Sequence, residues 1–270
     1  MQRGFRSGNA RCRSASGCCS DPNPDPKRNA SGAATLTAVS CRFDLILFDA
    51  DDTLFDFRQS EQAAFEACLT GHCGPGDYQS ALALYREISV PLWAQLERRS
   101  LTLEELRDVR WARLALRCSL EYSVPAISAA YVLELARHAH LIEGALDVCQ
   151  TLSRYCRLGI VSNGFQAVQQ GRLETSELRS CIDFLVTSES VGSGKPAAPI
   201  FERALELAQS PLDRARVLMV GDRLSSDIAG AKQMGFASCW FNPQRQPAPV
   251  ADVPDHIIYA LTELPALVLG

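Results

Sequence analysis

The sequence has no continuous apolar run of about 18 residues, the length that a membrane-spanning helix requires. It also has little excess charge, because 27 Lys and Arg stand against 31 Asp and Glu. The resulting net charge of -4 gives no basic footprint for nucleic acid. The 11 cysteines are an odd number and lack disulfide-type spacing. These absences predict a reduced, cytoplasmic protein with neither a membrane span nor a nucleic-acid partner.

Residues 1–40 lack the apolar stretch of about 7 to 15 residues that marks a secretory signal. They are rich in Ser, Gly, Asn, Arg and Pro, a composition that favours disorder. Their basic, Ser-rich character faintly suggests a transit peptide, but the segment DPNPDP fits one poorly. We therefore predict a disordered N-terminal extension, or a segment that reflects an upstream start site.

From Cys41 onward, strand patterns alternate with helix patterns. FDLILF (43–48) is short and apolar, as in a buried parallel strand, and further strands are predicted at 157–162, 184–188, 216–222, 237–241 and in HIIYAL (256–261). Helices are predicted between them at 145–154, 165–175, 199–208 and 225–234. This alternation predicts an α/β fold, a Rossmann-like doubly wound parallel sheet with helices on both faces.

Residues 58–139 contain no convincing strand. Helical apolar spacing occurs there at 81–99, 103–116 and 126–139. We therefore predict a core formed by residues 41–55 and 141–270, with an all-helical domain of residues 56–140 inserted after the first strand.

Polar side chains follow four of the predicted strands: Asp49 and Asp51; Ser162, Asn163 and Gly164; Lys195; and Asp222, with Asp227 close behind. Ligands of open α/β sheets bind outside the carboxyl ends of the strands, so we expect these groups to converge on one crevice. Carboxylates at close quarters stay ionised only with a cation among them. Oxygen ligands favour Mg²⁺, which is commonly held by one or two carboxylates and a substrate phosphate. The acids therefore predict half of a metal site that a phosphoryl group completes.

Two other motifs are weaker. Gly192-x-Gly194-x-x-Ala197 formally matches a dinucleotide fingerprint, but it contains Pro196 and does not open a strand–helix unit at the start of the fold. The same proline follows Lys195 where a phosphate-binding P-loop needs Ser or Thr. We therefore expect neither nicotinamide-dinucleotide binding nor a P-loop.

The four motifs, in this order, resemble those of the haloacid dehalogenase superfamily of aspartyl phosphotransferases. DAD followed by an acid, Thr and Leu, together with PLW (91–93) and VLMVGD, looks most like its bacterial pyrimidine 5'-nucleotidases. The resemblance spans residues 43–242, and the helical cap of the family matches residues 56–140. It implies a Mg²⁺-dependent phosphomonoesterase acting on a small-molecule phosphomonoester, with a preference for pyrimidine nucleoside 5'-monophosphates.

The resemblance also implies the roles of individual residues. Asp49 would be the nucleophile that forms an aspartyl-phosphate, and Asp51 the general acid and base, with its pKa raised. Lys195 would neutralise charge between Asp49 and phosphate. The phosphate side would be bound by Thr53, Ser162, Asn163 and Gly164. The metal would be held by Asp49, the backbone carbonyl of Asp51, Asp222 and, directly or through water, Asp227.

Plainer interpretations stay open for several of these residues. Asp52, where many members of the family have Gly, fits the cap of the next helix better than a catalytic role. Thr53 fits a turn, Ser162 a cap, and Asp227 a loop held by backbone hydrogen bonds. Among the residues of the predicted cap, Tyr85, Trp93 and Trp111 are candidates to stack on a base, although aromatic residues at helical spacing more often lie in a core.

Three other functions remain possible from the sequence. The first is a phosphatase of a small sugar or organic-acid phosphate, such as phosphoglycolate. The second is a different reaction on the same fold, by a phosphomutase or a dehalogenase; a dehalogenase needs neither Asp51 nor Asp222. The third is a binding module without catalysis, against which the intact set of Asp49, Asp51, Ser162, Lys195 and Asp222 argues.

Overall fold

The computed structural model describes residues 40–70, 72, 77–98, 100–209, 212–248, 250 and 253–270. The predicted N-terminal extension, apart from Ser40, lies outside these residues. Among the helices within them, none is long and apolar enough to cross a membrane.

One parallel sheet forms the centre of the described chain. Its six strands lie in the order β3-β2-β1-β4-β5-β6. The strands are β1 (Leu45–Phe48), β2 (Arg157–Ser162), β3 (Phe184–Thr187), β4 (Val217–Gly221), β5 (Ala237–Phe241) and β6 (His256–Ile258). The helices of this part are α5 (Ala145–Leu152), α6 (Gln166–Thr175), α7 (Ser188–Val191), α8 (Ala198–Leu207), α9 (Ala229–Met234) and α10 (Leu264–Val268). The predicted doubly wound parallel α/β fold is thereby confirmed.

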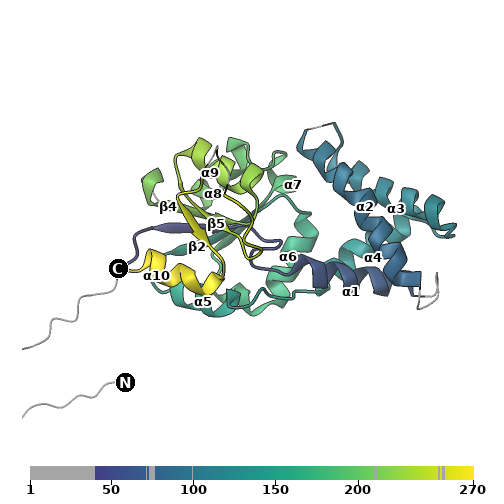
Figure 1. Ribbon diagram of the computed structural model, residues 1–270, viewed down its shortest axis with the longest axis horizontal. Helices are drawn as coiled ribbons and strands as arrows, with labels where there is room; N and C mark the ends of the chain where they lie inside the picture. Colours follow the sequence, from purple (N-terminus) through teal and green to yellow (C-terminus); the bar gives the residue numbers. More distant parts are fainter. Residues whose placement is uncertain are drawn as a thin grey trace, which may run out of the picture. The chain divides into compact units, whose positions relative to one another are not determined.

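The central strand β1 shows why its sequence is continuously apolar. Side chains alternate between the faces of a strand, and here both faces are covered. Leu45 and Leu47 belong to the core on the side of α8 and α9. Ile46 and Phe48 belong to the core on the side of α5 and α10 (Figure 1). Alternation between apolar and polar residues would therefore leave polar groups buried on one of these faces.

The order of the strands determines where a ligand can bind. Strand β1 pairs with β2 on one side and with β4 on the other. The chain passes from β1 to β2, and later crosses from β3 to β4 on the opposite side of β1. This reversal opens a crevice at the carboxyl ends of β1 and β4. The Asp49 amide donates to the carbonyl of Val220 at 2.9 Å, so residues following these two strands lie side by side.

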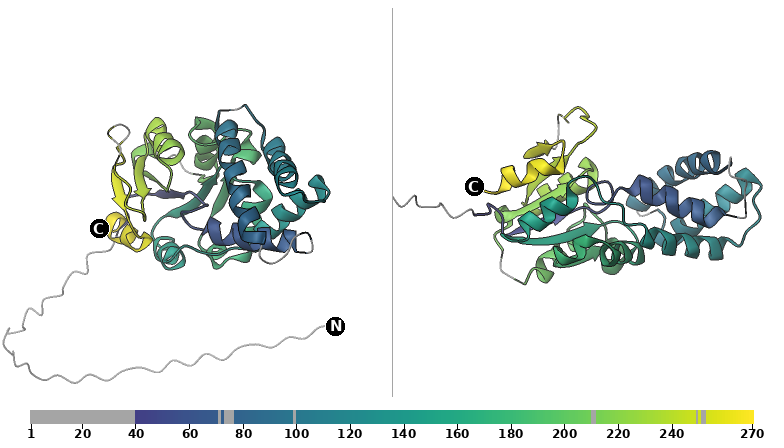
Figure 2. Two further views of the ribbon diagram at one scale, coloured as in Figure 1. Left: turned by 45° about the vertical axis from the view of Figure 1, so that its right-hand side comes forward. Right: turned by 90° about the horizontal axis from the view of Figure 1, so that it is seen from below.

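Four helices separate β1 from α5. They are α1 (Phe57–Leu69), α2 (Asp77–Glu97), α3 (Leu103–Cys118) and α4 (Val124–Arg137), and we call them the helical insertion. They pack on one another in a bundle (Figures 1 and 2). Their apolar core is centred on the buried rings of Phe65, Tyr85, Trp111 and Tyr131 and also includes Phe165 and Val168, beside and on α6. The helical insertion thus has a core of its own that reaches the sheet domain through α6.

The sequence does not predict α1. Two of its buried positions, Ser60 and Glu61, are polar. The Ser60 hydroxyl donates to the Asp56 carbonyl, and Glu61 accepts from Arg86 Nε at 2.6 Å. These polar residues interrupt the apolar spacing on which a helix prediction depends. At the other end of the chain, the predicted strand HIIYAL is shorter than expected, since only His256–Ile258 pairs with β5.

Candidate active site

Asp49 lies directly after β1 and meets a buried lysine. The Lys195 ammonium is 2.5 Å from Asp49 Oδ1 and 2.7 Å from Asp227 Oδ1. Burial raises the pKa of the Asp49 carboxyl, and the charge of Lys195 opposes this shift. Burial alone would lower the pKa of Lys195, but Asp227 and Asp49 together raise it above its ordinary value. The lysine is therefore a fixed positive charge against the carboxylate that ends β1.

Asp222 follows β4 and brings a third carboxylate to the same place. Its Oδ1 atom is buried and has no hydrogen-bond partner within the described part of the chain. Burial raises the pKa of Asp222 to about 8, and the charges of Asp49 and Asp227 act in the same direction. Trp240 Nε1 donates to the Asp222 carbonyl at 2.8 Å and holds the backbone in place. A buried carboxylate with an unused oxygen needs a positive partner to ionise at neutral pH.

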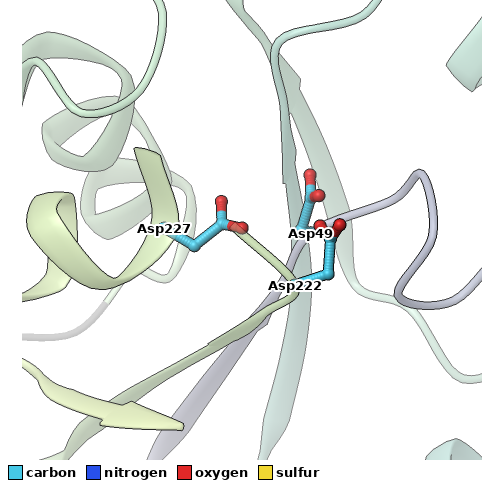
Figure 3. Close-up of side chains that lie close together, drawn as sticks. All are labelled: Asp49, Asp222 and Asp227. Atoms are coloured by element: carbon cyan, nitrogen blue, oxygen red, sulfur yellow. The ribbon is translucent and has the colours of Figure 1, made fainter. Parts of the chain in front are cut away.

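The three carboxylates form a set that suits a divalent cation. One oxygen each of Asp49, Asp222 and Asp227 lies within 4.8 Å of the others. Figure 3 shows the three side chains close together, Asp49 and Asp222 just after β1 and β4 and Asp227 on the helical segment that follows β4. Both Asp227 oxygens already accept hydrogen bonds, one from Lys195 and one from the Arg223 amide at 3.0 Å. By contrast, no hydrogen bond to Asp222 Oδ1 comes from any of the described residues. The donors are all hard oxygens, so the residues present fit Mg²⁺ or a similar cation.

Gly221, the last residue of β4, makes room for this cluster. A Cβ atom at this position would lie 2.3 Å from Asp227 Oδ2 and 2.6 Å from Asp227 Cβ. The Asp227 side chain is fully buried, so it cannot move aside into solvent. The close approach of backbone and carboxylate therefore requires glycine here.

We expect Gly221→Ala to displace Asp227, and with it the Lys195 ammonium. Overpacking of this kind costs about 1–3 kcal/mol of folding free energy, which a thermal melt would detect. Gly235→Ala measures a different cost, because Gly235 has a φ of 73°, which strains an alanine, while a Cβ there meets nothing within 4 Å. Its loss of stability should come without loss of activity, whereas Gly221→Ala should lose both. If Gly221→Ala kept its melting temperature and its activity, a Cβ at this position would not displace Asp227.

The residues that follow β2 hold the backbone of Lys195 in place. Asn163 Oδ1 accepts from the Lys195 amide at 2.7 Å, and Asn163 Nδ2 donates to the Lys195 carbonyl at 3.0 Å. Ser162 Oγ accepts from the Gly164 amide at 3.0 Å and is almost completely buried. The predicted Ser162, Asn163, Gly164 and Lys195 thus lie together, and Asn163 acts on the backbone of Lys195. Thr53 differs from them, because its buried hydroxyl has no partner among the described residues and does not line the cavity.

Asp51 does line the cavity, but its carboxylate is held by two residues that are not among the predicted site residues. Gln169 Nε2 donates to Asp51 Oδ2 at 2.8 Å, and Arg172 Nη1 donates to Asp51 Oδ1. One feature of the sequence could have identified Gln169 and Arg172: they are polar, yet they stand one turn apart on the same face of α6 as its buried apolar residues.

The prediction that Asp52 caps the next helix is wrong, because a different aspartate does so. The N-cap of α1 is Asp56, whose Oδ1 accepts from the Gln59 amide at 2.9 Å. Asp52 adopts a φ of 61°, a left-handed conformation that lets the chain turn back so that the Asp52 amide reaches the Phe55 carbonyl. Burial, and then the charge of Asp51, raise the pKa of Asp52 to about 6, while the Phe57 amide opposes the shift. Asp52 therefore lies at the cavity and only near the start of the helix.

A cavity of about 910 Å³ lies above these groups. One end of its lining consists of Asp49, Asp51, Ser162 and Lys195. The residues that the helical insertion contributes are mainly apolar: Phe57, Trp93, Leu96, Leu101 and Leu103, together with Thr102 and Glu104. Tyr85 and Trp111 are fully buried in the core of the insertion, so Trp93 is the remaining base-stacking candidate among the three. The cavity therefore pairs a charged floor with an apolar wall.

The architecture and the acidic site agree with the match to known families. The model of the haloacid dehalogenase-like hydrolases matches residues 43–235. The chain belongs to this family and is a hydrolase, which confirms the family predicted from the motifs.

Relatives extend over most of the described chain. Pyrimidine 5'-nucleotidase YjjG of Escherichia coli (strain K12) is 35% identical over 231 residues, which cover 84% of this chain and 98% of the relative. Pyrimidine 5'-nucleotidase PynA of Streptococcus pneumoniae is 29% identical over 223 residues, and the match covers 82% of this chain and 93% of the relative. The crystal structure of HAD-hydrolase YfnB from Bacillus subtilis bound to magnesium has a TM-score of 0.75 at 29% identity, and the match covers 84% of this chain and 98% of that one.

Proposed function

We propose that this hydrolase is a Mg²⁺-dependent phosphomonoesterase that acts through an aspartyl-phosphate on Asp49, with pyrimidine nucleoside 5'-monophosphates as substrates. The observation that carries the proposal is the contact of Asp49 with Lys195 beside the unpaired oxygen of Asp222. Asp49 and Lys195 line one cavity, and an oxygen of Asp222 lies within 4.8 Å of one of Asp49.

In this proposal, Asp49 attacks phosphorus, and the bond from phosphorus to the ester oxygen breaks. Asp51 gives a proton to the departing oxygen, then takes one from the water that hydrolyses the aspartyl-phosphate. Lys195 offsets the negative charge that Asp49 and the phosphoryl group bring together. Asp49 and Asp222 would hold Mg²⁺, and its positive charge would offset that of the phosphoryl oxygens. Asp227 keeps Lys195 in place through its 2.7 Å contact.

The helical insertion is the proposed cap, and the apolar end of the cavity is its contribution to substrate choice. The charged floor contacts the phosphate, which every phosphomonoester shares. Ligand cavities commonly measure roughly 300–1,000 Å³, and this one, at about 910 Å³, has room for a nucleoside as well as its phosphate. Two relatives that carry the name pyrimidine 5'-nucleotidase support the same substrate class.

A phosphatase of a small sugar phosphate or of phosphoglycolate is the second candidate. Its phosphate site would be the same, but a small polar substrate would leave Trp93, Leu96 and Leu103 without a partner. A dehalogenase fits the site less well, because that reaction makes no use of Asp222 or of a proton donor. A phosphomutase shares the phosphoryl chemistry and differs in the acceptor.

A phosphate-release screen tests the proposal. Purified full-length protein is assayed on pyrimidine and purine nucleoside 5'-monophosphates, deoxy forms included, and on sugar phosphates and phosphoglycolate. We expect the highest kcat/KM on the pyrimidine nucleotides, loss of turnover in EDTA and recovery with Mg²⁺. A screen led by a sugar phosphate would replace the substrate class, and full turnover in chelator would remove the metal from the mechanism.

Trp93→Ala is expected to reduce kcat/KM on a pyrimidine nucleotide by about 10-fold or more, because stacking of a base on an aromatic ring contributes roughly 1–3 kcal/mol. The loss on p-nitrophenyl phosphate is expected to be smaller, since that substrate carries no base. Trp93 also packs against Phe165, with ring centroids 6.4 Å apart, so the melting temperature is recorded alongside. Equal losses on both substrates at an unchanged melting temperature would show that Trp93 does not read the base.

A further inference from the structure

Helix α6 presents two buried polar side chains to the loop that follows β1. Gln169 is 1% exposed and Arg172 is 0% exposed. Gln169 contacts one oxygen of the Asp51 carboxylate and Arg172 the other. Asp51 thus lines the cavity with both of its oxygens held by one helix of the sheet domain.

The same guanidinium also reaches the helical insertion. Arg172 Nε donates to the carbonyl of Leu135, on the last turn of α4, at 3.1 Å. Its central carbon lies 5.5 Å from the centre of the Phe57 ring and 6.0 Å from that of Phe55, in the segment that leads from β1 into α1. A single side chain therefore contacts Asp51, the connecting segment and the end of α4.

We propose that Arg172 and Gln169 are positioning residues for Asp51, and that they fix the orientation from which this carboxylate exchanges a proton with the substrate. The inference rests on the proposed function, which assigns that proton transfer to Asp51. Aspartate has two side-chain torsions, and each added hydrogen bond removes freedom that would otherwise carry the carboxyl away from the ester oxygen. Proton transfer requires heavy atoms within hydrogen-bond reach, so orientation affects the rate directly.

A purely structural role explains these contacts less well. Burying a guanidinium carries a large desolvation cost, and well-packed apolar residues would often join two helices as stably. Moreover, Arg172 Nη2 and Gln169 Oε1 are buried without a hydrogen-bond partner in the described chain. Two incompletely bonded polar groups are a costly way to pack α6 against α4. Their shared partner, Asp51, supplies the reason to keep them.

The test uses Gln169→Met and Arg172→Lys in the full-length protein, with Asp51→Asn as the reference. Gln169→Met keeps the length of the side chain and removes the donor. Arg172→Lys keeps the charge but loses the planar fork that reaches Asp51 and Leu135 together. For each variant, kcat and KM are measured on uridine 5'-monophosphate. Single-turnover release of p-nitrophenol from p-nitrophenyl phosphate is measured with the enzyme in excess.

These two readouts separate positioning from folding. Uridine is a poor leaving group that needs a proton, whereas p-nitrophenolate leaves without one. We expect kcat on the nucleotide to fall about 10-fold for Gln169→Met and about 100-fold for Arg172→Lys, with KM within about 3-fold of the original. Single-turnover release of p-nitrophenol should stay within about 3-fold, in the same pattern as for Asp51→Asn.

Arg110→Lys is the matched control, because Arg110 is a second buried arginine, 2% exposed, whose guanidinium lies over the rings of Tyr85 and Tyr131. Its expected effect is a lower melting temperature without dependence on the leaving group. Equal losses on both substrates for Gln169→Met and Arg172→Lys, or no loss in folded protein, would overturn the inference. Should Arg172→Lys fail to fold, Gln169→Met decides alone. If Asp51→Asn itself shows no dependence on the leaving group, it is the proposed role of Asp51 that fails.

Discussion

Asp49→Asn is expected to abolish turnover on every phosphomonoester and to leave the fold intact. The amide has the shape of the carboxylate and can still accept a hydrogen bond from Lys195, which lies 2.5 Å from Oδ1. It lacks the charge and the lone-pair reactivity that attack on phosphorus requires. Loss of a nucleophile typically costs more than about 10⁴-fold in kcat. Phosphate release measured with Mg²⁺ present, together with a thermal melt, checks both halves of this expectation.

The direction of the change in stability caused by Asp49→Asn can also be predicted. Burial raises the pKa of Asp49, so the ionised side chain is costly in the metal-free fold. A neutral amide avoids that cost, and the melting temperature without metal should not fall. Asp44→Asn is the matched control, since Asp44 precedes the same strand but forms a surface ion pair with Arg216. That control should keep its turnover. Appreciable turnover by Asp49→Asn would remove Asp49 as the nucleophile.

The fold could be predicted from the sequence largely because strands that are buried on both faces of a sheet appear as short, continuously apolar segments. A strand such as Leu45–Phe48 has to be apolar throughout, and the turn to polar residues at Asp49 marks its end. The meeting of Asp49, Lys195 and Asp222 follows from the same geometry, because the carboxyl ends of parallel strands share one edge. Helix α1 escaped prediction because two of its buried positions are polar: Ser60 bonds to the Asp56 carbonyl one turn back, and Glu61 pairs with Arg86 on α2.

The contacts of Asp51 depend on a different kind of information. Its partner Arg172 stands 121 residues further along the chain, and the side-chain torsions that join them leave no periodic pattern. The motif indicates that an acid belongs at this position, but not which way its carboxylate turns. The same holds for the three aromatic candidates of the insertion. Tyr85, Trp93 and Trp111 all follow helical spacing, and only the packing shows that two are fully buried while Trp93 lines the cavity.

Asp222→Asn is expected to raise the Mg²⁺ concentration for half-maximal activity by at least about 100-fold, or to abolish activity. Changes to groups that merely support a metal ligand already cost roughly 10–100-fold in metal affinity, and Asp222 offers the unpaired oxygen itself. The measurement is a Mg²⁺ titration of initial rates on the preferred substrate. If the variant had an unchanged Mg²⁺ requirement, Asp222 would not be a ligand.

In the metal-free protein, Asp222→Asn should reduce the loss of stability that occurs as the pH rises. Folded Asp222 keeps its proton up to about pH 8, whereas an unfolded aspartate releases it near pH 4. The folded state therefore binds more protons across this window, and stability falls as the pH rises through it. Melting temperatures in EDTA at pH 6 and pH 8 should show this fall in the original protein and a smaller one in Asp222→Asn. Added Mg²⁺ should restore stability at pH 8 at a lower concentration in the original protein than in Asp222→Asn, because the variant lacks one of the carboxylates that bind the cation.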